Sequence, residues 1–270
     1  MFDKIQETAG FIKSKIDLAP QFAIVLGSGL GGLTKAVSIT HELPYTDIPN
    51  FPQSTVEGHE GKLIFGTIGN KNVMMMAGRF HYYEGYNMQE VTFPMRVMKA
   101  LGVTHMIVSN AAGGMNPDFL IGDIMFIRDH INLFPEHPLR GKNDPRLGVR
   151  FPDMSEPYDL QLLDAAHAIA REAGIEVKEG VYVGLQGPTF ETRAEYKWLH
   201  TIGGDAVGMS TVPEVIVAIH SGMKVFAASI ITDLGIREEL NTITHEEVLE
   251  AANAAAPKLE KIVSELIKSI

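Results

Sequence analysis

The stretch FAIVLGSG, residues 22–29, is a short apolar run that ends abruptly in glycine and serine. Four more runs have this character, with Val and Ile but no polar alternation: HMIVSN (105–110), GVYVGL (180–185), DAVGM (205–209) and KVFAASIIT (224–232). Continuous apolar runs of this length are typical of strands in a sheet that is covered on both faces. The pattern predicts an α/β fold with a mixed, largely parallel central sheet flanked by helices.

Other segments of the sequence show the signals of a hairpin and of helices. Residues 63–78 predict a hairpin with Gly69 and Asn70 at its turn. Residues 88–101 and 244–268 show helical periodicity, the first with Pro94 in or near its first turn and the second opening with a Thr244–Glu247 capping box. The apolar faces comprise Val91, Met95, Met98 and Leu101 in the first helix, and Val248, Ala252, Ala255, Leu259, Ile262 and Leu266 in the second.

Residues 134–157 hold five prolines and show no periodicity. A linker between two domains is one interpretation, but strands of the same character lie on both sides of it. An irregular stretch of this length inside a compact domain is usually functional or part of an interface. We therefore expect one domain spanning residues 1–270, with a functional or interface role for this segment.

Composition excludes several classes of protein. The 270 residues are 45% hydrophobic, carry a net charge of −10 and include no cysteine, so disulfides, thiolate metal sites and a cysteine nucleophile are excluded. The acidic balance argues against a nucleic-acid partner. No apolar run reaches the ~18 residues of a membrane span, and the start of the chain is not a secretory signal. We expect a cytoplasmic protein without membrane attachment.

Each predicted strand ends at small or polar residues. Ligands of α/β proteins bind outside the carboxyl ends of the strands, where backbone amides and hydroxyls gather. The five ends therefore predict one shared pocket. They are Gly27-Ser28-Gly29, Ser109 to Gly114, Gln186-Gly187-Pro188, Met209-Ser210-Thr211 and Thr232-Asp233.

Comparison with known sequence motifs limits the enzyme classes to which the chain can belong. Gly27, Gly29 and Gly32 match G-x-G-x-x-G, which favours a nicotinamide dehydrogenase, but the acid that should end a second strand falls at Asp47 in a proline-flanked loop. The chain contains no Walker loop and no H-E-x-x-H, and Ser210 lacks the second glycine of a nucleophile elbow. The ten histidines have no metal-ligand spacing, so no metal is expected.

The segment GRFHYYEGY, residues 78–86, concentrates donors and aromatic rings at the exit of the predicted hairpin. Each candidate by itself is more simply an ordinary turn or surface residue. A guanidinium beside hydroxyls and glycine-rich turns, however, is a recurring arrangement for binding phosphate. The residues so singled out are Ser28, His59, Arg79, His81 and Ser210.

Seven motifs appear in order: VLGSGLGGL, STVEGHEGKL, GRFHYYEGY, SNAAGGMNP, GDIMFIRDHINL, GPTFETRAE and DAVGMSTVPEVIVA. Together they resemble the trimeric, low-molecular-mass purine nucleoside phosphorylases from about residue 20 to the end of the chain. The resemblance implies the fold of that family and phosphorolysis of purine nucleosides to base and ribose 1-phosphate. It also implies a homotrimer that uses inorganic phosphate as co-substrate and needs no cofactor.

The resemblance further implies roles for single residues, with His81, Glu191 and Asp233 as the catalytic ones. Phosphate would be held by Ser28, His59, Arg79, His81, Ala111 and Ser210. The nucleoside would contact Tyr83, Phe190, Met209, His245, Glu191, Asp233 and, from the neighbouring subunit, Phe151. His130 would have a structural role, while Trp198 and the run Met74–Met76 are most simply core.

Asp233 departs from the family pattern, in which asparagine is usual. An amide both donates and accepts, whereas an ionised carboxylate only accepts and so suits a 6-amino group. Glu191, in contrast, suits the N1–H of hypoxanthine and guanine. We expect inosine and guanosine as main substrates with side activity on adenosine. The alternatives are an adenosine or methylthioadenosine phosphorylase and, more remotely, an NAD-dependent dehydrogenase or a non-catalytic nucleoside binder.

Overall fold

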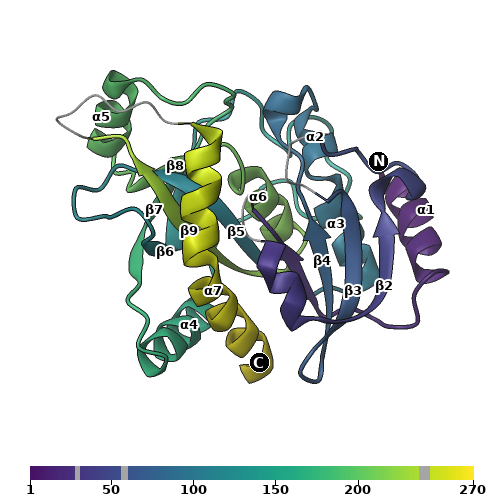
Figure 1. The fold of residues 1–270 in the computed structure, drawn as a ribbon. Coiled ribbons are helices and arrows are strands. Elements are labelled where there is room, and N and C mark those ends of the chain that lie inside the picture. The colour runs from purple at the N-terminus through teal and green to yellow at the C-terminus, as the bar shows by residue number, and fades with distance from the viewer. Residues whose placement is uncertain (28–30, 56–59, 237–243) are drawn as a thin grey trace.

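The computed structural model describes residues 1–27, 31–55, 60–236 and 244–270 (Figure 1). Ser28 and His59 lie outside the described residues. The strands are β1 (Phe22–Val25), β2 (Ser38–Pro44), β3 (Lys62–Ile68), β4 (Lys71–Ala77), β5 (His105–Gly114), β6 (Ile124–Asn132), β7 (Lys178–Gly184), β8 (Ala206–Gly208) and β9 (Lys224–Leu234). The helices are α1 (Phe2–Lys13), α2 (Met88–Val91), α3 (Phe93–Leu101), α4 (Leu160–Glu172), α5 (Arg193–Thr201), α6 (Val212–His220) and α7 (His245–Ser269), with 3-10 turns η1 (Gly31–Ala36), η2 (Tyr45–Asp47) and η3 (Tyr82–Glu84).

One mixed sheet joins all the described strands, in the order β2-β3-β4-β1-β5-β8-β7-β6-β9. β9 also pairs with β5, so that β5, β8, β7, β6 and β9 form a closed ring. Five of the strand pairings are parallel and four are antiparallel. The predicted hairpin is present as β3 and β4. The predicted fold class is therefore confirmed, although β2 and β6 were not among the strands expected from the sequence.

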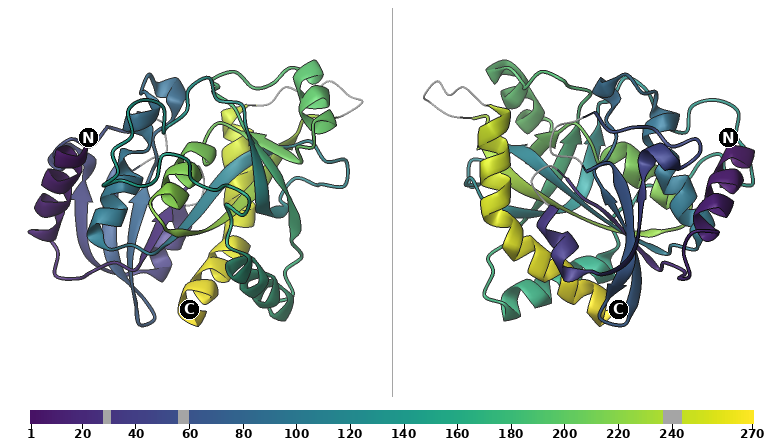
Figure 2. Two further views of the ribbon diagram at one scale, coloured as in Figure 1. Left: turned by 180° about the vertical axis from the view of Figure 1, so that it is seen from behind. Right: turned by 45° about the vertical axis from the view of Figure 1, so that its right-hand side comes forward.

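Helices cover both faces of this sheet. α7 lies on the face turned toward the viewer in Figure 1, where it packs on β9 and on α4. α3 and α6 lie on the opposite face, which comes forward in the reverse view of Figure 2, and α1 packs against α3. This double cover explains the apolar runs of the central strands β1 and β4, in which Phe22–Val25 and Met74–Met76 are all buried.

Three local features test the sequence predictions. The expected helix over 88–101 is interrupted at Thr92 and becomes α2 and α3, because a proline at position 94 cannot donate to a continuous ladder. Pro94 thereby falls in the first turn of α3. The α7 capping box is confirmed, since the Thr244 side chain accepts from Glu247 N. Residues 134–157, all of them described, contain no helix or strand.

Trp198 is not a core residue, contrary to expectation: 52% of it is exposed. α5 buries only a narrow stripe formed by Tyr196 and Leu199, and Trp198 lies off that stripe. Within the described part of the chain, no helix has the length and apolar character needed to cross a membrane.

Candidate active site

A cavity of about 510 Å³ lies where the strand ends meet. Gly27 after β1, the Asn110–Gly113 segment of β5, Met209 and Ser210 after β8, and Thr232 and Asp233 of β9 all line it. Pro188, which follows β7, lines it as well. The predicted convergence of the five strand ends is therefore confirmed. It follows from the strand pairings: β5 has β1, β8 and β9 as neighbours, and β7 pairs with β8.

Most of the predicted site residues line this one cavity. They are Arg79, His81, Tyr83, Ala111, Phe190, Glu191, Met209, Ser210, Asp233 and His245. Phe151 does not line it: its side chain is 87% exposed and belongs to a separate surface hollow. The cavity thus unites residues that are far apart in the sequence, and their individual roles in binding stay predictions.

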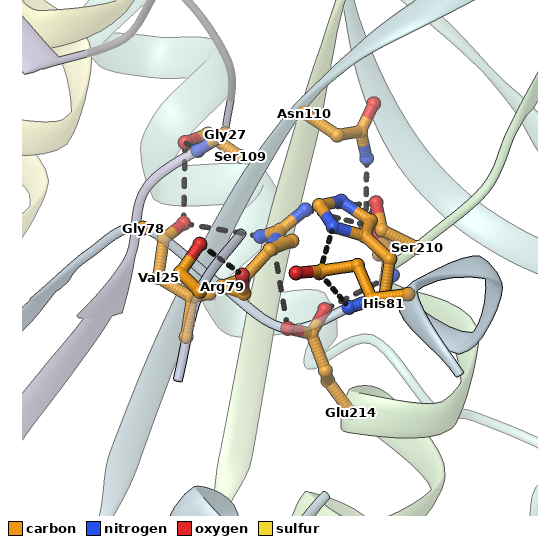
Figure 3. A network of polar contacts seen from close by, with 12 residues as sticks. Val25, Gly27, Gly78, Arg79, His81, Ser109, Asn110, Ser210 and Glu214 are labelled. Carbon is orange, nitrogen blue, oxygen red and sulfur yellow. Dashed lines mark hydrogen bonds and ion pairs between the residues drawn. The ribbon is translucent and has the colours of Figure 1, made fainter. Parts of the chain in front are cut away.

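Arg79 is buried at the centre of a polar network (Figure 3). Its Nη1 donates to Ser210 Oγ at 2.8 Å, and its Nη2 donates to the Val25 carbonyl at 3.3 Å. Its Nε lies 3.4 Å from Glu214 Oε1, and both side chains are only 2% exposed. The guanidinium is therefore held rigidly by a strand carbonyl, a hydroxyl and a buried counter-ion, as expected for a cation that must stay charged away from water.

A tight backbone turn presents the Ser210 hydroxyl to Arg79. Thr211 has φ 69° and ψ −56°, and Val212 N donates to Ser210 O at 2.7 Å across it. This is a γ-turn with positive φ, which is a strained conformation for a β-branched residue. Two hydrogen bonds of Thr211 offset this strain. Its hydroxyl accepts from Asn110 Nδ2 at 2.9 Å, and its backbone amide donates to Glu214 Oε2 at 2.9 Å.

His81 is fixed by a carboxylate from the same segment. Its Nδ1 lies 3.1 Å from Glu84 Oε1, and its backbone amide donates to the same oxygen at 2.7 Å. Burial lowers the pKa of His81, which favours the neutral ring. Burial by itself would raise the pKa of Glu84, but hydrogen bonds from His81 and Thr55 outweigh it and lower that pKa to about 2. The neutral ring therefore donates from Nδ1 to an ionised Glu84 and presents Nε2 as an acceptor.

A second group of titratable side chains in the cavity contains the carboxyls of Asp233 and Glu191. Asp233 is buried; its Oδ1 accepts from Thr232 Oγ1 at 3.1 Å, and its Oδ2 accepts from Tyr196 Oη at 3.2 Å. Burial raises the pKa of Glu191, and the nearby charge of Asp233 acts in the same direction. Two carboxyls in one buried site favour a state in which one of them keeps its proton.

Sequence reasoning missed Glu84, Tyr196 and Glu214, and it named Thr211 only as part of a polar strand end. A signal existed for Glu214, because Thr211-x-x-Glu214 has the spacing of a capping box that opens α6. None existed for Tyr196, whose partner Asp233 is 37 positions away. Among the described residues, no group of three or more His, Asp or Glu side chains is arranged to hold a metal ion.

The comparisons with known proteins agree with this geometry. The family model described as the phosphorylase superfamily matches residues 21–268. The purine nucleoside phosphorylase of Bos taurus is 51% identical over 100% of this chain and 96% of its own length. Two crystal structures of the Schistosoma purine nucleoside phosphorylase, one with adenosine and one with hypoxanthine, superpose with TM-scores of 0.94 at 42% and 41% identity, each over 99% of this chain and 97% of theirs. The chain therefore belongs to the phosphorylase superfamily and, within it, to the purine nucleoside phosphorylases.

Proposed function

We propose that the chain catalyses the reversible phosphorolysis of purine ribonucleosides and 2′-deoxyribonucleosides, chiefly inosine and guanosine, in purine salvage. The observation that carries this proposal is one cavity lined both by a buried arginine–hydroxyl cluster and by a pair of carboxyls. The first cluster suits an anion, and the second suits the edge of a purine. Tyr83, Phe190 and Met209 line the same cavity and offer apolar surface for the ribose between them.

The chemistry follows from charge development along the C1′–N9 bond. As this bond breaks, the sugar becomes oxocarbenium-like and the purine gains negative charge. Phosphate held by Arg79 and Ser210 stabilises the cation and supplies the attacking oxygen. His81, with Nδ1 bonded to Glu84, accepts at Nε2 from a protonated phosphate oxygen. A single preorganised donor such as the Arg79 guanidinium is typically worth ~3 kcal/mol in the transition state.

The base would be recognised by Glu191, which accepts from N1–H, and by Asp233, which faces N7 and the 6-substituent. A neutral Asp233 donates to N7 and stabilises the departing base. An ionised Asp233 accepts from a 6-amino group, so adenosine is the expected minor substrate. The adenosine found in the Schistosoma relative supports keeping an adenosine phosphorylase as the second candidate.

The same proposal includes a single domain of residues 1–270, a cytoplasmic homotrimer and no cofactor. Phe151 supports the assembly, because an 87% exposed aromatic side chain beside Val149, itself 64% exposed, is suited to an interface. In a cyclic trimer, Phe151 would close the ribose end of the neighbour's cavity. The irregular segment 134–157 would then serve as the interface element that its prolines indicate.

The decisive assay measures hypoxanthine release from inosine with and without phosphate. The proposal requires turnover that depends on phosphate and produces ribose 1-phosphate. Turnover that depends on NAD instead would support the dehydrogenase. Nucleoside binding without turnover, measured by calorimetry, would support a non-catalytic binder.

A further inference from the structure

Tyr196 lies between the two carboxyls that face the cavity. It is 2% exposed, and its hydroxyl hydrogen-bonds to Asp233 Oδ2 at 3.2 Å. A hydrogen bond between the same hydroxyl and the Glu191 carboxyl acts on the pKa of both groups. One phenol thus joins Glu191 on the loop before α5 to Asp233 on β9.

Two glycines make room for this phenol. A Cβ at Gly235 would lie 2.1–2.2 Å from three ring carbons of Tyr196, a distance no real side chain permits. A Cβ at Gly113 would lie 3.1 Å from the Tyr196 hydroxyl and 3.0 Å from Asp233 Oδ2. Backbone from β5 and from the end of β9 therefore closes around the ring and its hydroxyl. The position of the phenol is built into the fold rather than left to a mobile side chain.

Purines present opposite hydrogen-bonding patterns at this edge. A 6-oxopurine donates from N1–H and accepts at O6, whereas a 6-aminopurine accepts at N1 and donates from its 6-amino group. The first pattern needs an ionised Glu191 and a protonated Asp233. The second needs a protonated Glu191 and an ionised Asp233. Each class of base requires one proton on the pair, but on opposite carboxyls.

We propose that Tyr196 relays one proton between Glu191 and Asp233, so that the same pocket accepts both 6-oxo- and 6-aminopurines. In the relay, protonated Asp233 gives its proton to Tyr196 Oη, while the phenol gives its own proton to ionised Glu191. The reverse transfer restores the first state. Charge and proton count are unchanged, and no other reactant is needed. This inference rests on the proposed function, because it assigns the substrate classes of the same site.

The environment of the phenol suits this role. Burial raises the pKa of Tyr196, and the charges of Asp233 and Glu191 raise it further, so the hydroxyl is not lost as a phenolate. Burial also raises the pKa of Glu191, which favours its protonated form. Thr232 Oγ1 donates to Asp233 Oδ1, and the phenol hydroxyl donates to Oδ2 of the same carboxyl.

Tyr196→Phe tests the relay because it keeps the ring between the two glycines and removes only the hydroxyl. Without that hydroxyl the proton can no longer cross between the two carboxyls. It stays on Asp233, the more deeply buried of the two, which is the state for 6-oxopurines. The ratio of kcat/KM for adenosine to that for inosine should fall about tenfold or more, the effect of losing a hydrogen bond to a charged group. Tyr83→Phe is the matched control: it removes another hydroxyl of the cavity, and it should affect both nucleosides alike.

In an Asp233→Asn background, where adenosine cleavage is expected to be lost, the calorimetric affinity for adenine relative to hypoxanthine should not fall further with Tyr196→Phe, because an amide cannot take part in the relay. An equal loss for both nucleosides in Tyr196→Phe would overturn the relay, as would a wild-type chain that never cleaves adenosine. If neither nucleoside is cleaved with phosphate present, the proposed function fails. Calorimetry then tests the relay separately: Tyr196→Phe should weaken the binding of adenine more than the binding of hypoxanthine.

Discussion

Replacing Arg79 with alanine should affect stability and phosphate binding by amounts that the structure allows us to separate. The substitution removes the contacts to Ser210 and Val25 and leaves the Glu214 carboxylate buried without its counter-ion. Breaking such a buried pair costs about 3–5 kcal/mol of unfolding free energy. For a chain of this size, about 2–4 °C of melting temperature is lost per kcal/mol, so we expect a decrease of roughly 6–20 °C.

The kinetic effect should be selective. A charge-assisted hydrogen bond to phosphate contributes about 1.5–3 kcal/mol, and about 1.4 kcal/mol corresponds to a factor of ten. The KM for phosphate should therefore rise roughly 10- to 150-fold, with a much smaller change in the KM for inosine. The assay is hypoxanthine release, with each substrate varied at saturating concentration of the other and well below the melting temperature of the variant.

Two further variants separate the two effects. Glu214→Gln added to Arg79→Ala removes the orphaned charge, so stability should partly recover while the KM for phosphate stays high. Arg96→Ala is the matched control: Arg96 donates to Leu147 O, Ser221 Oγ and His220 Nδ1 away from the cavity, so its loss should destabilise the fold without a selective effect on phosphate. Equal increases in both KM values for Arg79→Ala would refute a phosphate role and make Arg79 a structural residue.

Three other predictions concern assembly, base selection and pH. Light scattering should find a particle of three 29.6-kDa chains, and Phe151→Ala should raise the KM for nucleoside rather than phosphate; a fully active monomer would contradict the shared site. Asp233→Asn should abolish adenosine cleavage and increase the preference for inosine, whereas a wild type that prefers adenosine or methylthioadenosine in direct competition would contradict the preference for 6-oxopurines. Burial lowers the pKa of His130 from 6.5 to about 4, so its stabilising contribution is complete above pH 6.5 and is lost as the pH falls toward 4. Over that range the unfolding free energy of His130→Gln should therefore decrease less steeply than that of the wild type; parallel curves from chemical denaturation would refute this.

Local sequence patterns were sufficient for much of the architecture. Apolar runs without alternation indicated strands covered on both faces, and β1, β5, β7, β8 and β9 all lie within or overlap those runs. The capping box at Thr244 located the start of α7, because that signal depends only on residues three positions apart. The polar strand ends indicated a common pocket, since ligands of α/β proteins bind outside the carboxyl ends of the strands.

The partners inside the pocket were decided by the tertiary structure alone. Arg79 meets Ser210 across 131 positions of sequence, and Glu214 becomes its counter-ion because α6 begins directly behind that contact. Tyr196 meets Asp233 only because the backbone at Gly113 and Gly235 leaves space for its ring. Periodicity records which face of an element is buried, but not which element covers it. The order of the strands in the sheet supplies that information, and the pairing of charges in the cavity follows from it.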